Sequence, residues 1–132
     1  MLLVKTKIGP SGIDGLGLFA DQFIPKGLAV WRLVPGFDID LTIEQIASLS
    51  EVAREQFVHY GHVDMFTGQH VLCADNARFL NHWDDPNICC CMSPTPDDED
   101  IDVAVRDILK GEELTINYKE YDADWPRKLG SV

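Results

Sequence analysis

Two short segments in the second half of the chain combine apolar residues with polar side chains that could do chemistry. The first spans residues 78–87 and contains Asn81 and His82, and the second spans residues 111–118 and ends at Tyr118. Asparagine offers hydrogen-bond donors and an acceptor, histidine can donate or accept, and tyrosine carries a hydroxyl. Functional sites often break the local patterns of ordinary strands, so the two segments together favour a catalyst.

Each of these features also has a plainer structural interpretation. Asp85 and Asn87 flank Pro86, and such residues commonly make side-chain turns. Tyr118 suits a strand end that buries its ring and leaves its hydroxyl in water. The residue types alone therefore leave a structural and a catalytic interpretation open.

A glycine-rich loop in the N-terminal part of the chain is a further candidate for ligand binding. Residues 9–17 contain four glycines and include Gly15-Leu16-Gly17. Glycine has no Cβ, so such a backbone can approach a ligand closely or make a plain turn. The loop lacks the third glycine and the following helix of a dinucleotide-binding fingerprint, which argues against a Rossmann fold.

Histidines and cysteines raise the alternative of a zinc-stabilised interaction domain. His59, His62, His70 and Cys73 have spacings of three, eight and three residues, which zinc ligands could have. The first two histidines lie at the end of a predicted helix, which favours ordinary surface or core roles. Residues 89–91 are consecutive cysteines, whose side chains would alternate between the faces of a strand and are expected to be structural.

Composition restricts the class of protein. The 132 residues fit one domain, and the net charge of −11 argues against binding to a phosphate backbone. The acidity suits a cationic partner, although it could serve solubility alone. No long apolar run is present and residues 1–5 are too short for a signal peptide, so we expect an intracellular, cytoplasmic protein without membrane contact.

Residue patterning predicts a mainly β chain with one helical region. Residues 42–60 have apolar residues at helical intervals, with a capping box at Thr42 and Gln45 and a second helix start at Ser50. A hairpin turn is expected near Gly68, and a polar tail at 119–132. Alternation or apolar runs predict strands at 4–8, 18–20, 28–34, 71–74, 88–92, 101–106 and 114–118, with an acidic loop at 93–100.

Four motifs, read in order, resemble the SET-domain protein-lysine methyltransferases. They lie at residues 15–20, 24–27, 78–87 and 111–118. The resemblance implies a minimal SET domain over residues 1–132, mainly β, with several small sheets and a C-terminal pseudoknot. It also implies a short helical insert at about 38–70 and no zinc-binding tail, because no cysteine follows Tyr118.

The resemblance further implies a cofactor, S-adenosylmethionine, and a set of site residues without a metal. Tyr118 would be the catalytic residue. Tyr60, Tyr121 and Trp125 would line the substrate channel, the last two or a partner chain replacing the missing tail. The cofactor-binding residues would be Gly15, Leu16, Gly17, Arg78, Phe79, Asn81 and His82.

The expected activity is transfer of a methyl group to a lysine of a basic protein or peptide. Direct nucleic-acid binding is not expected, and a homodimer is compatible with the resemblance. The alternative is a SET-like module that binds cofactor or peptide with little or no turnover. Trp83, Asp84 and Asn117 depart from the residues common at their positions in the family, which marks the surroundings of the cofactor segment as unusual.

Overall fold

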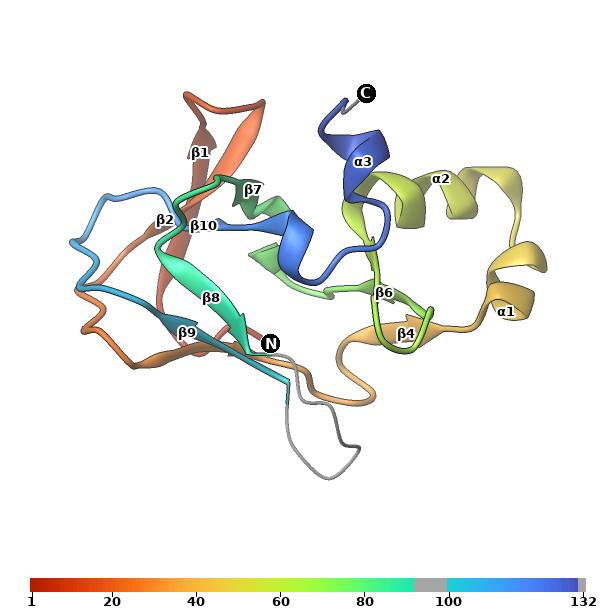
Figure 1. The fold of residues 1–132 in the computed structure, drawn as a ribbon, viewed down its shortest axis with the longest axis horizontal. Helices are drawn as coiled ribbons and strands as arrows, with labels where there is room; N and C mark the ends of the chain where they lie inside the picture. Colours follow the sequence, from red (N-terminus) through yellow and green to blue (C-terminus); the bar gives the residue numbers. More distant parts are fainter. Residues whose placement is uncertain (92–99, 131–132) are drawn as a thin grey trace.

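The computed structural model describes residues 1–91 and 100–130 (Figure 1). The fold is mainly β, as the sequence predicts, and its helices are short. The N-terminal half contains β1 Thr6–Pro10, β2 Leu16–Ala20, β3 Ala29–Arg32, β4 Ile39–Leu41, α1 Ile43–Ala47 and α2 Glu51–Tyr60. The second half contains β5 His62–Val63, β6 His70–Leu72, η1 Asn76–Phe79, β7 Asn81–His82, β8 Ile88–Cys91, β9 Ile101–Ala104, β10 Thr115–Ile116, η2 Tyr118–Glu120 and α3 Trp125–Lys128.

The described strands form three small sheets. The largest has the order β3-β9-β8-β10-β7, while β1 pairs with β2 and β6 lies between β4 and β5. Strand β10 lies between β7 and β8 and is parallel to both. A late segment of the chain is thus inserted between two strands that follow each other in sequence, which is the pseudoknot that the family resemblance implies.

A single apolar cluster fixes this arrangement. Leu18 from β2, Ile88 from β8 and Ile116 from β10 are almost completely excluded from solvent and pack together with Leu114. Burial of a large aliphatic side chain contributes about 1.5–3 kcal/mol, so these contacts resist separation of the three strands. The core therefore holds residues 78–87 and 111–118 beside each other.

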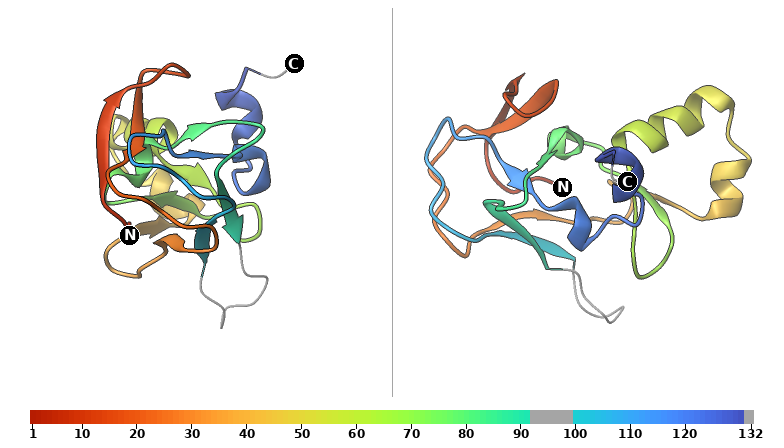
Figure 2. Two further views of the ribbon diagram at one scale, coloured as in Figure 1. Left: turned by 90° about the vertical axis from the view of Figure 1, so that its left-hand side faces the viewer. Right: turned by 45° about the horizontal axis from the view of Figure 1, so that its top comes forward.

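The helical insert lies at the opposite end of the molecule from the β1–β2 hairpin (Figure 2). Thr42 and Gln45 form the expected capping box, and Ser50 caps α2 through a hydrogen bond from the amide of Ala53. Helix α2 ends at Gly61, where a Cβ would lie 2.6 Å from the carbonyl oxygens of Phe57 and Val71. Only glycine fits that position, because no real Cβ approaches a backbone oxygen so closely.

Several predicted boundaries are wrong. The strand expected at 114–118 covers only Thr115 and Ile116, because the Asn117 side chain caps η2, which begins at Tyr118. The strand expected at 4–8 instead covers Thr6–Pro10, because these are the residues of β1 that pair with β2. The tail at 119–132 contains α3, which no helical pattern in the sequence had indicated.

Other predictions are confirmed in position. The hairpin turn at Gly68 joins β5 to β6, and its φ of +71° is one that glycine adopts readily. Strands β8 and β9 pair antiparallel, as a hairpin requires, while most of the acidic loop predicted at 93–100 lies outside the described residues. Within the described ranges, no helix is long and apolar enough to cross a membrane.

Candidate active site

Asn87 ties the two chemistry-bearing segments together. Its side-chain amide nitrogen donates to the carbonyl of Glu113 at 2.8 Å, and its Oδ1 accepts from the amide of Thr115 at 2.8 Å. Asn87 and Thr115 are both buried. Because these bonds replace water for buried polar groups, they fix the register of β10 and with it the position of Tyr118, the second residue beyond the strand.

Asn81 holds the glycine-rich loop. Its Nδ2 donates to the carbonyls of Asp14 and Leu16 at 3.1 and 3.2 Å, and to Glu113 Oε2 at 3.1 Å. Glu113 accepts two further bonds from Ser11 Oγ, at 2.7 and 2.9 Å. The Asn81 and Glu113 side chains therefore clamp the loop from both sides.

Gly15 and Gly17 are each favoured in this loop for a different physical reason. A Cβ on Gly17 would lie 2.8 Å from a carboxylate oxygen of Glu113, so a side chain there would push the clamp apart. Gly15 has a φ of +46°, in the left-handed region that other residues rarely adopt. Leu16, between them, is exposed, and Asp14 lines the adjoining cavity.

Tyr118 is held by two contacts to the Asn81–His82 segment. Its hydroxyl donates to the carbonyl of Leu80, and its backbone amide donates to His82 Nδ1 at 3.1 Å. The other ring nitrogen of His82 lies 3.2 Å from a carboxylate oxygen of Asp84. His82 thus positions Tyr118 through its ring, a contact that the sequence did not indicate.

The hydroxyl of Tyr118 remains protonated at neutral pH. Burial, followed by the charges of Asp122 and Asp14, raises its pKa to about 12. A protonated hydroxyl can donate a hydrogen bond but cannot act as a base under these conditions. The chemistry available to Tyr118 is therefore orientation and polarisation.

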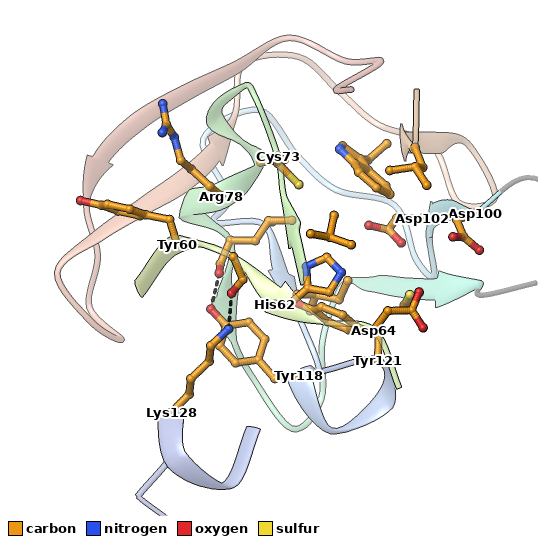
Figure 3. Close-up of a pocket in the computed structure, with 18 of the residues that line it drawn as sticks. Tyr60, His62, Asp64, Cys73, Arg78, Asp100, Asp102, Tyr118, Tyr121 and Lys128 are labelled. Atoms are coloured by element: carbon orange, nitrogen blue, oxygen red, sulfur yellow. Dashed lines mark hydrogen bonds between the residues drawn. The ribbon is translucent and has the colours of Figure 1, made fainter. Parts of the chain in front are cut away.

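A cavity of about 440 Å³ opens beside this tyrosine (Figure 3). Tyr60 and Arg78 lie at one end, near the glycine loop, with the guanidinium 5.7 Å from the centre of the tyrosine ring. The middle is aromatic, because Tyr121 packs edge-on against Tyr118 at 6.0 Å. The opposite end is acidic and carries Asp40, Asp64, Asp100 and Asp102.

Burial also changes the charge state of groups at the acidic end. It raises the pKa of Asp40, with added repulsion from Asp64 and Asp100, and it raises the pKa of Asp102 to about 7. Burial lowers the pKa of His62 to about 4, so this imidazole, 4.9 Å from the Tyr121 ring, is neutral at pH 7. The cavity therefore combines uncharged aromatic and imidazole rings in its middle with carboxylates at one end.

A lysine of the chain itself reaches the aromatic middle. Lys128, on α3, places its ammonium 2.6 Å from Asp122 Oδ2 and donates to the carbonyl of Gly61. The same ammonium lies 5.6 Å from the centre of the Tyr118 ring, in cation–π range. The polar end of this side chain thus lies beside the tyrosine to which the family resemblance gives the catalytic role.

The structure gathers most of the predicted site residues, but not all. Arg78, Tyr60, Tyr118 and Tyr121 line the cavity, and the loop at Gly15, Leu16 and Gly17 adjoins it through Asp14 and Asn81. The Phe79 ring contacts Tyr60 edge-on at 5.9 Å. His82 is not part of the cavity lining and directs its ring at the Tyr118 backbone.

Trp125 also lies outside the cavity lining. Its ring is covered by the ammonium of Lys119 at 5.8 Å, while Arg127 and Lys128 from the same helix line the cavity in its place. The family resemblance suggested Trp125 as a channel wall in place of the missing tail, but the direction of a side chain on a four-residue helix depends on how that helix docks. Trp83 is 52% exposed on the surface.

Four contributing residues were not among the predicted site residues. Asn87 is the last residue of the motif at 78–87, so its place in that motif was a usable signal. Glu113 lies in the second motif, but its partners are distant in sequence. Asp122 and Lys128 gave no signal, because a single acidic or basic residue in a polar tail is ordinary.

The zinc alternative is not supported by this geometry. Across residues 1–91 and 100–130, no three or more His, Cys, Asp or Glu side chains are arranged so that they could hold a metal ion. His59 stacks edge-on against Tyr60 at 4.5 Å, and His62 stacks against Tyr121. Burial raises the pKa of Cys73 to about 12, which disfavours the thiolate that zinc binds. His59, His62, His70 and Cys73 do not form a ligand set.

The fold and the site together define a compact β domain in which a knotted pair of segments presents a tyrosine to a cavity. A family model of the SET domain matches residues 15–119, and the chain therefore belongs to the SET-domain family, whose members are methyltransferases. The match includes all four motifs. No curated protein matches the sequence closely enough to count as a relative.

Solved structures share the fold at low sequence identity. A Plasmodium falciparum protein described as a candidate histone methyltransferase is 22% identical, with a TM-score of 0.62 over 89% of this chain and 95% of that one. The Chaetomium thermophilum Polycomb Repressive Complex 2, autoinhibited and bound to S-adenosylmethionine, is 24% identical, with a TM-score of 0.68. The match covers 96% of this chain and 16% of that one.

The same complex bound to histone H3 trimethylated at lysine 27 is 23% identical to the chain, with a TM-score of 0.63. That match covers 87% of this chain and 14% of the other. The present chain thus corresponds to a small part of the Polycomb protein. At these identities the likeness establishes the fold alone.

Proposed function

We propose that the protein transfers a methyl group from S-adenosylmethionine to the side-chain amine of a lysine in a basic protein segment. The observation that carries this proposal is the placement of Tyr118. Its protonated hydroxyl is fixed by the Leu80 carbonyl, its amide by His82, and its ring borders a cavity that adjoins the clamped glycine loop.

The residues of the loop and of η1 suit this cofactor. Leu16 of the loop is exposed, the loop is held by hydrogen bonds from Asn81, and Arg78 is an exposed residue whose guanidinium could pair with a carboxylate. A Cβ on Gly17 would meet the Glu113 carboxylate that accepts from Asn81 and Ser11, so a side chain there would disturb the clamped loop. When bound there, S-adenosylmethionine would supply an electrophilic methyl group.

The cavity can prepare a lysine amine for attack. A free lysine has a pKa of about 10.4 and is almost fully protonated at neutral pH, but only the neutral amine has a lone pair to donate. Removal from water disfavours the ammonium form. Tyr118, Tyr121 and neutral His62 provide such an environment, and the Tyr118 hydroxyl and the Leu80 carbonyl orient the reacting group.

The acidic end of the cavity favours a cationic substrate. Burial, with added repulsion from Asp64 and Asp100, raises the pKa of Asp40. A basic peptide segment would relieve that repulsion, and the net charge of −11 would attract it from a distance. These charges support a lysine flanked by further basic residues as the substrate.

The test is transfer of labelled methyl groups into the proteins of a cell extract, followed by mass spectrometry of the modified lysines. The Tyr118→Phe variant should lose about 100-fold or more in rate, as removal of one oriented hydroxyl typically does. Its affinity for S-adenosylmethionine, measured by calorimetry, should stay near that of the wild type. A binding module without turnover would show cofactor affinity and no labelled lysine in either protein.

A further inference from the structure

The contact between Lys128 and Asp122 has the geometry of a bound ammonium ligand. The two charged atoms lie 2.6 Å apart, the Asp122 side chain is completely buried, and that of Lys128 is 16% exposed. The Gly61 carbonyl accepts a second hydrogen bond, and the Tyr118 ring covers a further side of the cation. In Figure 3 the lysine enters from α3 and ends beside the Tyr118 hydroxyl.

Each of these groups is held in place by contacts other than Lys128. Asp122 Oδ1 accepts from the amides of Val63 and Asp124 at 3.0 and 2.9 Å, so the carboxylate is oriented from two directions. Gly61 ends α2 with its own amide bonded to Phe57. The Tyr118 ring is fixed through its hydroxyl and amide. The site is therefore built by the domain and then filled by a lysine.

The segment that brings the lysine is weakly attached. Helix α3 has only four residues, Trp125–Lys128, and isolated helices of that length are unstable in water. Apart from Lys128, its contacts include a bond from Arg127 to the Val58 carbonyl at 2.9 Å and an exposed ion pair between Arg127 and Asp124. Exposed pairs of this kind contribute little stability.

We propose that Asp122, the Gly61 carbonyl and the Tyr118 ring form the recognition site for the ammonium of the acceptor lysine, and that Lys128 occupies this site until a substrate lysine displaces it. The identity of the displacing lysine as a methyl acceptor rests on the proposed function. Asp122 then selects a primary ammonium on entry, and α3 moves aside when substrate binds. The bound ammonium releases its proton to solvent before the neutral amine accepts the methyl group.

A structural clasp is the competing explanation, in which Lys128 only neutralises a buried carboxylate. The two explanations differ in whether a free ammonium can enter the site formed by Asp122, the Gly61 carbonyl and the Tyr118 ring. n-Butylammonium, which has the length of a lysine side chain, is the probe, and n-butanol is its uncharged control. We expect Lys128→Ala to bind n-butylammonium at least about tenfold more tightly than the wild type, whose site is already occupied.

Thermal shift and calorimetry measure this binding without any cofactor. The Lys128→Ala protein should be stabilised by n-butylammonium and not by n-butanol, and the added change Asp122→Asn should abolish the effect. Lys110→Ala is the matched control, because Lys110 is an exposed lysine that pairs with Asp21 outside this tail. It should bind the amine no better than the wild type.

Hydrogen exchange of the wild-type protein tests whether a free ammonium displaces Lys128, even if Lys128→Ala does not fold. n-Butylammonium should speed exchange of the α3 amides, including that of Leu129, which bonds to the Trp125 carbonyl at 2.9 Å, and n-butanol should not. Unchanged exchange, or a folded Lys128→Ala protein indifferent to the amine, overturns the proposed site. Methyl transfer is assayed in parallel: transfer without amine binding refutes only this site, and amine binding without transfer refutes only the methyltransferase function.

Discussion

Replacement of Asn87 by alanine should weaken the whole fold, because this side chain fastens β10 between its neighbours. The change removes the acceptor for the Thr115 amide and the donor for the Glu113 carbonyl, both at 2.8 Å. Thr115 is only 7% exposed, so its amide would have no water to replace the lost partner. The site tyrosine lies two peptide units beyond β10 and depends on the same register.

The size of the effect follows from the burial of the two groups. An unsatisfied buried amide costs about 1–3 kcal/mol, and loss of the second bond adds about 0.5–1.5 kcal/mol. We therefore expect Asn87→Ala to lower the free energy of unfolding by about 2–4 kcal/mol, a large part of the 5–15 kcal/mol typical of such domains.

Urea denaturation followed by circular dichroism measures this change. The midpoint should fall while the slope with denaturant stays constant. Asn117→Ala is the matched control, because Asn117 accepts a comparable bond from the Lys119 amide at 3.1 Å in an exposed turn. Its cost should be about 1 kcal/mol. If Asn87→Ala unfolds within about 0.5 kcal/mol of the wild type, or costs no more than Asn117→Ala, the role assigned to Asn87 is wrong.

Three further predictions concern pH and the tail. Because the pKa of Asp102 is raised from 3.8 to about 7, its contribution is full below pH 3.8 and is lost as pH rises toward 7, about 4 kcal/mol at most. Asp102→Asn should remove that decline from urea-unfolding free energies. Because the pKa of His62 is lowered from 6.5 to about 4, stability should fall by up to about 3 kcal/mol as pH drops through that interval, and His62→Gln should remove this slope. The two slopes oppose each other between pH 4 and 6.5, so each is read as the difference from its variant. Deletion of residues 120–132 should abolish methyl transfer, since it removes Tyr121 from the cavity wall and Asp122 from the proposed ammonium site, and normal turnover by the truncated protein would refute this.

Local chemistry made much of the chain predictable. The helix caps at Thr42 and Ser50 depend on side chains within three residues of the helix start, so they can be predicted from the sequence alone. The turn at Gly68 can be predicted for the same reason. The ends of strands were harder to predict, because pairing with a distant partner decides where a strand stops, as the shortened β10 illustrates.

For the site, too, local features could be predicted from the sequence and long-range contacts could not. The motifs around Asn81 and Tyr118 carry residue types whose order along the chain indicated a SET domain and its chemistry. Their contacts did not follow from that order: the ring of His82 holds the Tyr118 backbone, and Asn81 clamps a loop more than 60 positions away. Hydrogen bonds of this range depend on how the sheets pack.

The sequence alone determined the family, the helical insert and the candidate tyrosine, because motif order, capping residues and apolar spacing are local properties. Only the tertiary structure decided that Trp125 lies outside the cavity and that Lys128 lies inside it. Both residues belong to one short helix with no strong propensity of its own. The buried carboxylate of Asp122 decides which side chain of this helix turns inward. An isolated carboxylate in the interior requires a cation, and Lys128 provides it.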